Sequence, residues 1–370
     1  MQKLIARIFA VLMKSKGWVF LILSAILIKW ISLYPSFIEK YYTNGVYPII
    51  SRILRILFGW IPFSLGDLFY SFLLLIVFYK MFQLTRIIWN KKFNRQYLIA
   101  GLQQLIFFFL FVYVLFYLLW GLNYNRLGSA SQLDLKLVKY SNTDVDTLLS
   151  KLTERLNTYA DRFSTEEKKI LNRKRNLFIE TKEAYDSAIA YYPFIQYQSR
   201  SIKPSIFSYA GNYLGFQGYY NPFSGEAQVN TTVPQVLEPF VTCHEVAHQI
   251  GYAKENEANF VGYLAAKHSS SSYFRYSVYF DLFNYTFNDL SKKDSSAARK
   301  YIAQLHPQVK KDMKEWSDFY LRHRNPLESI IAWGYGQFLK ANNQPAGKRT
   351  YNEVVAWLVA FYKKYGIEEI

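Results

Sequence analysis

His244-Glu245-Val246-Ala247-His248 is the stretch that decides the fold and chemistry expected of this chain. Residues four apart on an α-helix share a face, so both imidazoles can bind one ion. Glu245 lies beside His244 and can take a proton from a metal-bound water in the same cleft. This HExxH pattern is typical of zinc peptidases. A catalytic zinc also needs a third protein ligand and an open position for water.

The segment after the motif offers that third ligand. Gly251 predicts a helix stop, and a second helix is predicted from Glu255 onward. Glu255 and Asn259 share a face of this helix, so Glu255 can bind Zn²⁺ while Asn259 hydrogen-bonds a ligand histidine. Glu257 points about 200° away from Glu255 around the helix and remains the alternative ligand.

A surface helix with two solvated histidines is the alternative to a metal site. The chain has 5 histidines, and the motif uses two of them in an apolar context that begins at Phe240-Val241. The charges between Glu238 and Lys267 exclude a site inside the membrane. The single cysteine, Cys243, is predicted to be a buried helix residue and not a ligand. These features favour a metal site, although His and carboxylate ligands also suit divalent ions other than zinc.

Long apolar runs are confined to the first third of the chain. A bilayer span needs roughly 20 apolar residues, and three stretches qualify, at about 17–34, 65–82 and 98–122. Val46 to Trp60 is apolar apart from Arg52 and Arg55, which predicts an amphipathic helix on the membrane surface or across the bundle. We therefore expect a membrane domain over residues 1–124 and a soluble domain over residues 125–370.

Positive charges predict how these spans are oriented. They gather before the first span and between the second and third, at Lys3, Arg7, Lys14, Lys16, Arg86, Lys91, Lys92 and Arg95. By the positive-inside rule, the N-terminus is cytoplasmic and the soluble domain of this multi-pass cell-membrane protein is extracytoplasmic. The alternative is that the first apolar segment packs peripherally and the domain faces inward. The net charge of +17 fits a lipid bilayer as partner, and no basic cluster interleaved with aromatics indicates nucleic acid.

Helical patterns dominate the expected soluble domain. Ser141 and Ser164 begin N-cap patterns, and Pro193 ends the second helical stretch. Glycines, prolines and short β-prone runs between Lys203 and Thr232 predict strands and turns. One predicted strand is Glu226-Ala227-Gln228-Val229-Asn230. The expected fold class is mostly α with a small β-sheet (α+β).

Several further motifs carry a resemblance to a known family. They are Phe58–Ser64, Trp120–Tyr124, Gly218–Ala227, His244–Gln249, Glu255–Phe260 and Phe338–Asn342. In content and order they resemble a bacterial family known as domain of unknown function 3810. The resemblance covers nearly the whole chain and implies a membrane-bound, metallopeptidase-like protein without a known substrate.

The expected core also resembles the gluzincin class of zinc peptidases, in which a glutamate helix follows the HExxH helix. Glu255 with Asn259 matches that class, although the connection from His248 to Glu255 is shorter than in many gluzincins. In that class an edge strand just before the motif pairs with extended substrate. The resemblance thus makes Glu226–Asn230 a candidate substrate strand, with a purely structural strand as the equal alternative.

The expected reaction is metal-assisted hydrolysis of a peptide or protein substrate, with Glu245 as general base. Tyr335 and His323 are candidate oxyanion donors, each with a structural or surface role as alternative. A structural zinc site is normally closed by four protein ligands, and here three are evident, which favours an enzyme. The alternatives are a non-enzymatic protein that binds zinc, a partner or cell wall, and a sensor protease that cleaves one regulatory partner.

Overall fold

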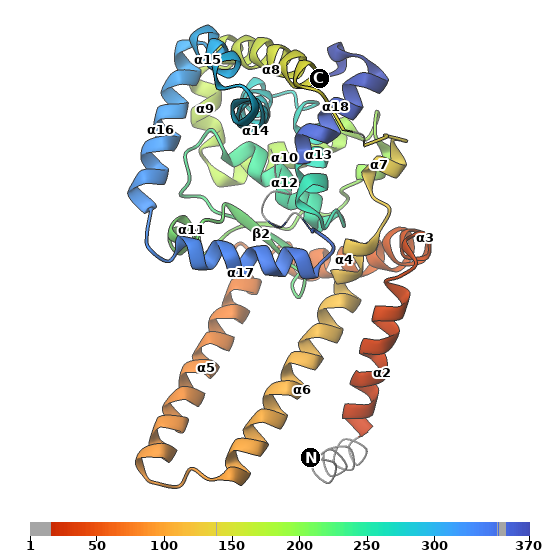
Figure 1. Ribbon diagram of the computed structural model, residues 1–370, viewed down its shortest axis with the longest axis vertical. Coiled ribbons are helices and arrows are strands. Elements are labelled where there is room, and N and C mark those ends of the chain that lie inside the picture. Colours follow the sequence, from red (N-terminus) through yellow and green to blue (C-terminus); the bar gives the residue numbers. More distant parts are fainter. Residues whose placement is uncertain (1–15, 138, 346, 348–352) are drawn as a thin grey trace. The chain divides into compact units, whose positions relative to one another are not determined.

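A computed structural model describes residues 16–137, 139–345, 347 and 353–370, and Figure 1 labels its elements. The chain divides into two compact units. The first comprises Met1–Ile50 and Leu65–Arg126, and the second comprises Ser51–Ser64 and Leu127–Ile370. Segment Ser51–Ser64, which the sequence places in the membrane domain, therefore clusters with the second unit. Three cations used for the expected orientation, Lys3, Arg7 and Lys14, lie outside the described residues.

The first unit is helical. Its elements are α2 (Lys16–Ile31), α3 (Pro35–Phe37), η1 (Ile38–Val46), α5 (Leu65–Trp89), α6 (Arg95–Leu119) and η2 (Gly121–Asn125). Helix α2 packs along α6, and Trp18 meets Phe107 edge-on with ring centroids 5.1 Å apart. A buried hydrogen bond from Thr43 Oγ1 to Asn123 Oδ1, 3.0 Å long, joins η1 to η2.

Two of these helices, α5 and α6, are long and apolar enough to cross a membrane. Helix α2 passes the same test only together with Pro35–Phe58, from which it is bent by 101°. The described chain thus has two spans, or three if the bent pair counts as one. The expected uninterrupted span over residues 17–34 is therefore broken near its end. Pro35 has no backbone N–H to donate, so α2 ends before it.

The second unit contains most of the helices. They are α4 (Tyr47–Phe58, from Ser51 on), α7 (Ser129–Gln132), α8 (Asn142–Arg162), α9 (Thr165–Leu171), α10 (Lys174–Ala188), η3 (Pro193–Ile195), α11 (Ser208–Leu214), α12 (Glu238–Gln249), α13 (Glu255–Ala266), α14 (Ser272–Lys293), α15 (Ser295–Gln304), α16 (Pro307–His323), α17 (Glu328–Ala341), α18 (Val354–Tyr365) and η5 (Ile367–Glu369). Ser141 and Ser164 cap α8 and α9 as predicted, each accepting a hydrogen bond from the backbone N–H three residues on.

A small sheet lies beside these helices. Its strands are β1 (Ile202–Pro204), β2 (Gly218–Asn221) and β3 (Glu226–Val229), in the order β1-β3-β2. Strand β3 pairs with β1 in parallel and with β2 in antiparallel orientation. The helix α11 between β1 and β2 was not predicted. The predicted class, mostly helical with a small sheet, is confirmed.

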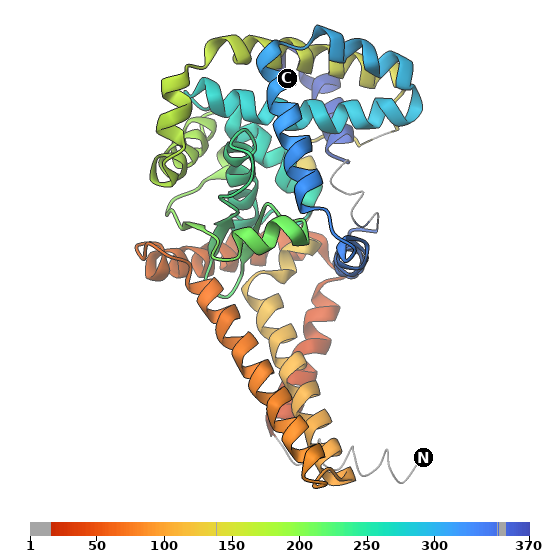
Figure 2. The same ribbon diagram turned by 90° about the vertical axis from the view of Figure 1, so that its left-hand side faces the viewer.

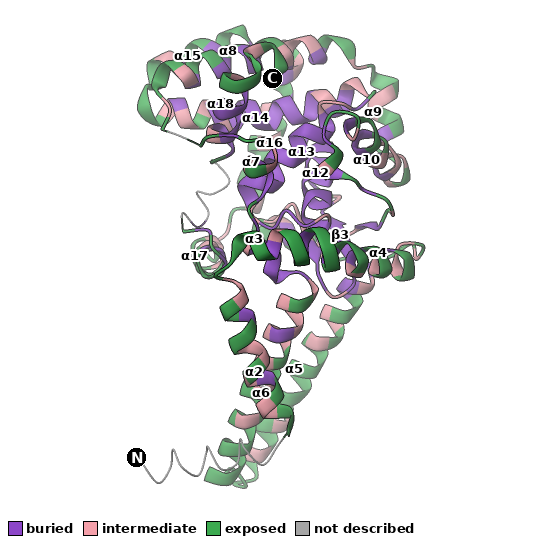
Figure 3. Ribbon diagram, turned by 90° about the vertical axis from the view of Figure 1, so that its right-hand side faces the viewer, coloured by how far each residue is buried: buried purple, intermediate pink, exposed green. Residues whose placement is uncertain are grey.

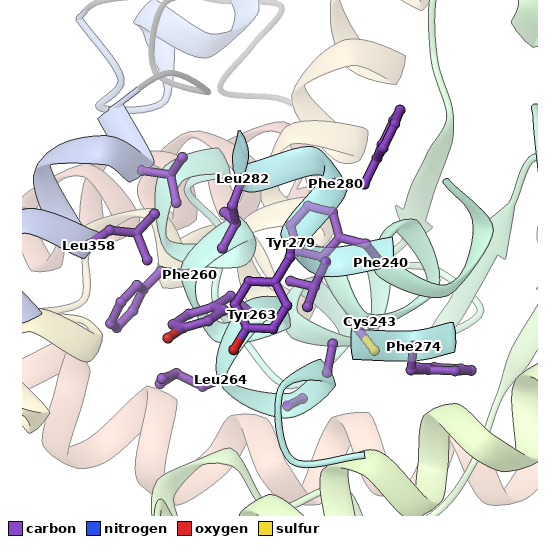
Figure 4. Packing of buried hydrophobic residues seen from close by; sticks show 14 of the residues in the cluster. Phe240, Cys243, Phe260, Tyr263, Leu264, Phe274, Tyr279, Phe280, Leu282 and Leu358 are labelled. Carbon is purple, nitrogen blue, oxygen red and sulfur yellow. The ribbon is translucent and has the colours of Figure 1, made fainter. Parts of the chain in front are cut away.

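Helices α12, α13 and α14 form the centre of the core. Phe240, Phe260, Tyr263, Phe274 and Phe280 pack together there (Figure 4). Cys243 lies among them and is fully buried, as predicted. Every residue of α12 and α13 is buried, and both helices are purple in Figure 3. The motif residues are therefore held on two rigid helices inside the unit.

Candidate metal centre

Helices α12 and α13 approach each other closely at the motif. A Cβ atom on Gly262 of α13 would lie 3.1 Å from the backbone nitrogen of His244, so a larger residue would push the helices apart. Between them the chain turns at Gly251, which has a φ of +97° that glycine adopts without strain. This turn brings the first residue of α13, Glu255, back to the two histidines of α12.

His244, His248 and Glu255 form one buried cluster. Their candidate ligand atoms all lie within 4.8 Å of one another. Glu255 Oε2 is 3.2 Å from His244 Nε2 and 3.4 Å from His248 Nε2. Tetrahedral zinc with bonds of about 2.0–2.2 Å places its ligand atoms roughly 3.3–3.5 Å apart. The spacing and the donor set therefore fit a zinc ion.

Both imidazoles are oriented by hydrogen bonds at their other nitrogen. His248 Nδ1 donates to the carbonyl oxygen of Tyr252 at 2.7 Å, and His244 Nδ1 lies 2.7 Å from Asn259 Oδ1. A proton on Nδ1 leaves Nε2 as the electron-pair donor, which is the arrangement that metal-binding histidines use. Asn259 thus stands where the sequence predicted it, behind a candidate ligand.

Glu255 is held from two further sides. The Tyr335 hydroxyl donates to its Oε1 at 2.7 Å, and its backbone N–H donates to Gln344 Oε1 at 3.0 Å. Both partners come from α17 and the turn after it. Of the two residues predicted as oxyanion donors, Tyr335 is therefore the one that contacts the cluster.

Glu257, the alternative ligand, points elsewhere. A Cβ atom on Gly128 would lie 2.0 Å from Glu257 Oε1, so this carboxylate packs against the loop before α7. Gly128 has a φ of +82°, which also favours glycine. Lys254 Nζ is 3.8 Å from the same oxygen. As predicted from helix geometry, the two carboxylates point in different directions: Glu255 lies beside the histidines, and Glu257 lies beside Gly128 and Lys254.

Glu245 lies against strand β2. A Cβ atom on Gly218 would be 2.6 Å from Glu245 Oε1, so glycine makes room for this carboxyl group. Burial raises the pKa of Glu245 to about 8. Its Oε2 is buried and has no hydrogen-bond partner among the described residues. The candidate base therefore has one oxygen available for a water or a substrate.

The pKa values of the three clustered side chains are shifted in different directions. Burial lowers the pKa of His244, whereas the nearby Glu255 carboxylate outweighs burial at His248 and raises its pKa to about 9. Burial opposes ionisation of Glu255, but His248 and the hydrogen bonds from both histidines lower its pKa well below the ordinary value. Without a cation the cluster thus holds Glu255 as a carboxylate beside a protonated His248, and a metal ion would take the place of that proton.

The candidate substrate strand needs a correction. Strand β3 (Glu226–Val229) is the central strand, because it pairs with β1 on one side and β2 on the other. It therefore has no edge for an added strand. Its residues Glu226, Ala227, Gln228 and Val229 are buried, and Asn230 lies just beyond it with its Nδ2 2.8 Å from Asn212 Oδ1. The outer strand at the candidate base is β2, which carries Gly218.

His323 lies in a cavity of about 240 Å³ bordered by α11, α16 and α17. Its Nδ1 donates to the carbonyl oxygen of Phe319 at 2.8 Å, and its ring meets Tyr213 edge-on at 4.9 Å. Drug-sized ligands occupy roughly 300–1,000 Å³, so this cavity suits a single side chain. These contacts place His323 away from the three-residue cluster.

Several residues that shape the centre were not predicted from the sequence. Gly262 and Gly218 act through the absence of a side chain, and Tyr252 acts through its backbone carbonyl. Gln344 reaches Glu255 from far along the chain. Gly218 opens one of the motifs quoted for the family resemblance, which was the available signal for its importance.

Residues 42–359 match the family described as "Protein of unknown function (DUF3810)". The chain belongs to the DUF3810 family. The match includes His244, Glu245, His248, Glu255 and Tyr335, so the whole candidate centre of this DUF3810 protein lies inside the family region. No curated protein and no solved structure matches the chain.

Proposed function

We propose that this DUF3810 protein is a membrane-anchored zinc metallopeptidase. The observation that carries the proposal is a buried His-His-Glu cluster, in which Glu255 Oε2 is 3.2 Å and 3.4 Å from the Nε2 atoms of two histidines on the same helix as Glu245. Three protein ligands leave a fourth tetrahedral position for water. Glu245, with one buried oxygen without a partner among the described residues, supports a catalytic rather than a structural centre.

In the proposed reaction, His244, His248 and Glu255 would hold a zinc ion, which would supply an acidic water and a Lewis acid for the scissile carbonyl group. Glu245 would accept a proton from the attacking water and pass it to the leaving amine. Burial raises the pKa of Glu245 in the cation-free protein, and a divalent cation beside it would favour the carboxylate form that a base requires. Tyr335 is the proposed hydrogen-bond donor to the developing oxyanion, for which its single O–H would turn from Glu255 to the substrate.

A peptide or protein is the proposed substrate, and β2 is the proposed wall of its binding site. The Gly218 backbone approaches Glu245 too closely for any side chain to stand between them. A peptide bond presented to Glu245 would therefore lie beside this strand. The cavity around His323 is the proposed pocket for one substrate side chain.

Metal content of the purified full-length protein tests the site. We expect about one zinc per chain by mass spectrometry, with less than roughly a tenth of it left in His248→Ala and Glu255→Ala. Glu257→Gln is the matched control and is expected to keep its zinc. A wild-type protein that takes up no zinc when the metal is supplied would rule out the proposal.

Hydrolysis of fluorescein-labelled casein tests the reaction. Glu245→Gln is expected to keep its zinc while losing at least about 100-fold in rate, because the general base is gone. Full activity in this variant would show that any cleavage seen comes from another centre or a contaminant.

A further inference from the structure

Exposed apolar side chains of the second unit gather on and beside α11 and α17. We define the apolar surface by six of them, Tyr209, Leu214, Leu321, Leu327, Ile330 and Trp333, which are 43% to 68% exposed. Together with five neighbouring residues they make up eleven of the sixteen large apolar side chains that are exposed among the described residues from Leu127 onward. Helices α11 and α17 contact each other. A soluble protein seldom leaves an apolar patch of this kind open to water.

Helix α17 has the composition of a helix that lies in a membrane interface. Leu327, Ile330 and Gly334 follow the helical repeat along one exposed face. Among the exposed residues of this helix, Lys340 is the one that carries a charge. Interfacial helices place aromatic and aliphatic side chains in the lipid and cations beside them at the headgroups. Trp333 and Lys340 fit these two positions.

The second unit continues along the chain directly into a candidate span. Its segment Ser51–Ser64 is followed directly by Leu65, the first residue of α5. Trp60, five residues before the span, is 79% exposed, as expected for a tryptophan at a bilayer surface. In Figures 1 and 2, α11, α17 and the Ser51–Phe58 part of α4 lie along one edge of the second unit.

Hydrogen bonds fix Ser51–Ser64 to the sheet. Lys203 Nζ donates to the carbonyl oxygen of Gly59 at 2.9 Å, and Gln228 Nε2 donates to Ser64 Oγ at 2.7 Å. Ser64, the residue before α5, is therefore held within the second unit.

We propose that the apolar surface lies against the lipid bilayer, with α17 among the headgroups. Continuity with α5 makes lipid, rather than a second copy of the chain, the occupant. Exposed Arg322, Arg324 and Lys340 flank the apolar side chains. Cations at these positions are attracted to anionic lipid headgroups.

The proposal links the bilayer to the candidate metal centre. Tyr335 lies on α17 and donates its hydrogen bond to Glu255, so one helix carries lipid contacts and a ligand contact. If the proposed function holds, the site takes its substrate at the membrane surface. The preferred substrate is then a peptide segment of a membrane-attached protein, with a soluble protein such as casein as a poorer one.

Depth-dependent fluorescence quenching tests the lipid contact in the full-length protein. Ile330→Cys and Trp333→Cys are labelled with the fluorophore NBD and reconstituted into phosphatidylcholine–phosphatidylglycerol vesicles that contain lipids with a nitroxide on acyl carbon 5. Ile170→Cys is the matched control, since Ile170 is 48% exposed on α9. Cys243 is buried and should not react, which the unsubstituted protein checks.

We expect more than roughly half of the fluorescence to be lost at residues 330 and 333, and less than about a tenth at residue 170. Quenching at 330 and 333 that does not exceed the value at 170 would overturn the lipid contact. Leu327→Cys repeats the measurement if either variant misfolds. Because quenching is also measured after zinc removal, it is independent of the proposed function. Strong quenching at residues 330 and 333 in a protein that binds no zinc would support the lipid contact but contradict the proposed membrane-attached substrate.

Discussion

Gly218 of the sheet closely approaches Glu245 of the motif helix. The 2.6 Å separation between a Cβ atom on Gly218 and Glu245 Oε1 is shorter than any real contact of this kind. The residue at position 218 thus decides where the carboxyl group of the proposed general base lies. It does so without touching the proposed ligands.

Gly218→Ala is expected to displace Glu245 and to lower the rate of casein cleavage at least tenfold (about 1.4 kcal/mol). Zinc content should stay the same, because the three ligands are unaffected. Gly334→Ala is the matched control, since a Cβ atom there meets nothing within 4 Å. An unchanged rate in Gly218→Ala would mean that Glu245 has another way to reach its position.

The hydrogen bond between Asn259 and His244 is expected to orient this candidate zinc ligand. Asn259→Ala removes the group 2.7 Å from His244 Nδ1 and is expected to weaken zinc binding about 10–100-fold, as measured by competition with a chelator. Asn256→Ala, on the same helix but bound to Glu353, should bind zinc like the wild type. Equal affinity in the two variants would contradict a role for Asn259 in orienting His244.

Helix α14 carries an unusual buried acid. Asp281 is 5% exposed, its Oδ2 has no hydrogen-bond partner among the described residues, and burial raises its pKa from 3.8 to about 8. Between these two pH values the unfolded chain is ionised while the folded chain keeps the proton. The free energy of unfolding therefore falls as pH rises from about 4 to about 8.

Asp281→Asn removes this dependence, because the amide resembles the protonated acid and cannot ionise. We expect the substitution to stabilise the protein by about 1–3 kcal/mol at pH 7.5 and by much less at pH 5. Thermal unfolding in detergent at both pH values measures the difference. A stabilisation that is equal at both pH values would show that Asp281 is not protonated in the folded protein near neutral pH.

At the scale of elements, local signals were sufficient for some features and insufficient for others. Ser141 and Ser164 cap their helices as predicted, because a capping side chain bonds a backbone N–H three residues on. The place of β3 in the sheet depends on pairing with β1, which is more than twenty residues earlier. No local pattern encodes which strand is central, and the substrate-strand prediction failed for this reason.

In the candidate site too, some features could be predicted from local sequence and others could not. Helical spacing predicted that His244 and His248 share a face of one helix, and that Glu255 and Asn259 share a face of the next, with Asn259 behind a histidine. The contact from Tyr335 joins residues 80 apart, and sequence could only name that residue as a candidate. Close approaches at glycine leave no positive sequence signal, because the feature is a missing side chain.

At the scale of the whole molecule, the number of spans decides on which side the second unit lies. Two spans return the chain to the side of its N-terminus, whereas a third, formed by α2 with the bent segment, places the ends on opposite sides. We expect three spans, with the second unit outside the cytoplasm. Alkaline phosphatase fused after Ile370 should then be active and green fluorescent protein dark. Fluorescence without phosphatase activity would indicate two spans or a reversed orientation.

Removing the N-terminal part should destabilise the second unit. The fragment Leu127–Ile370 lacks the Ser51 hydroxyl that donates to the carbonyl oxygen of Gln249 at 3.0 Å, and it lacks the bonds of Gly59 and Ser64 to the sheet. At about 1 kcal/mol each, we expect a loss of roughly 3 kcal/mol. Thermal unfolding of the fragment, with and without Ser51–Ser64 fused to its N-terminus, measures this. Equal melting temperatures would contradict the structural role of the segment.

The long reach of these contacts also sets when the centre can form during synthesis. Ser51 lies 198 residues before its hydrogen-bond partner Gln249. Glu255 lies 89 residues before its partner Gln344. At about 5–20 residues per second, the ribosome needs roughly 10–40 s to pass from Ser51 to Gln249. Ser51 is thus synthesised well before its partner Gln249 leaves the ribosome. The hydrogen bond that fixes the backbone of Glu255 can therefore form only after most of the chain has been synthesised.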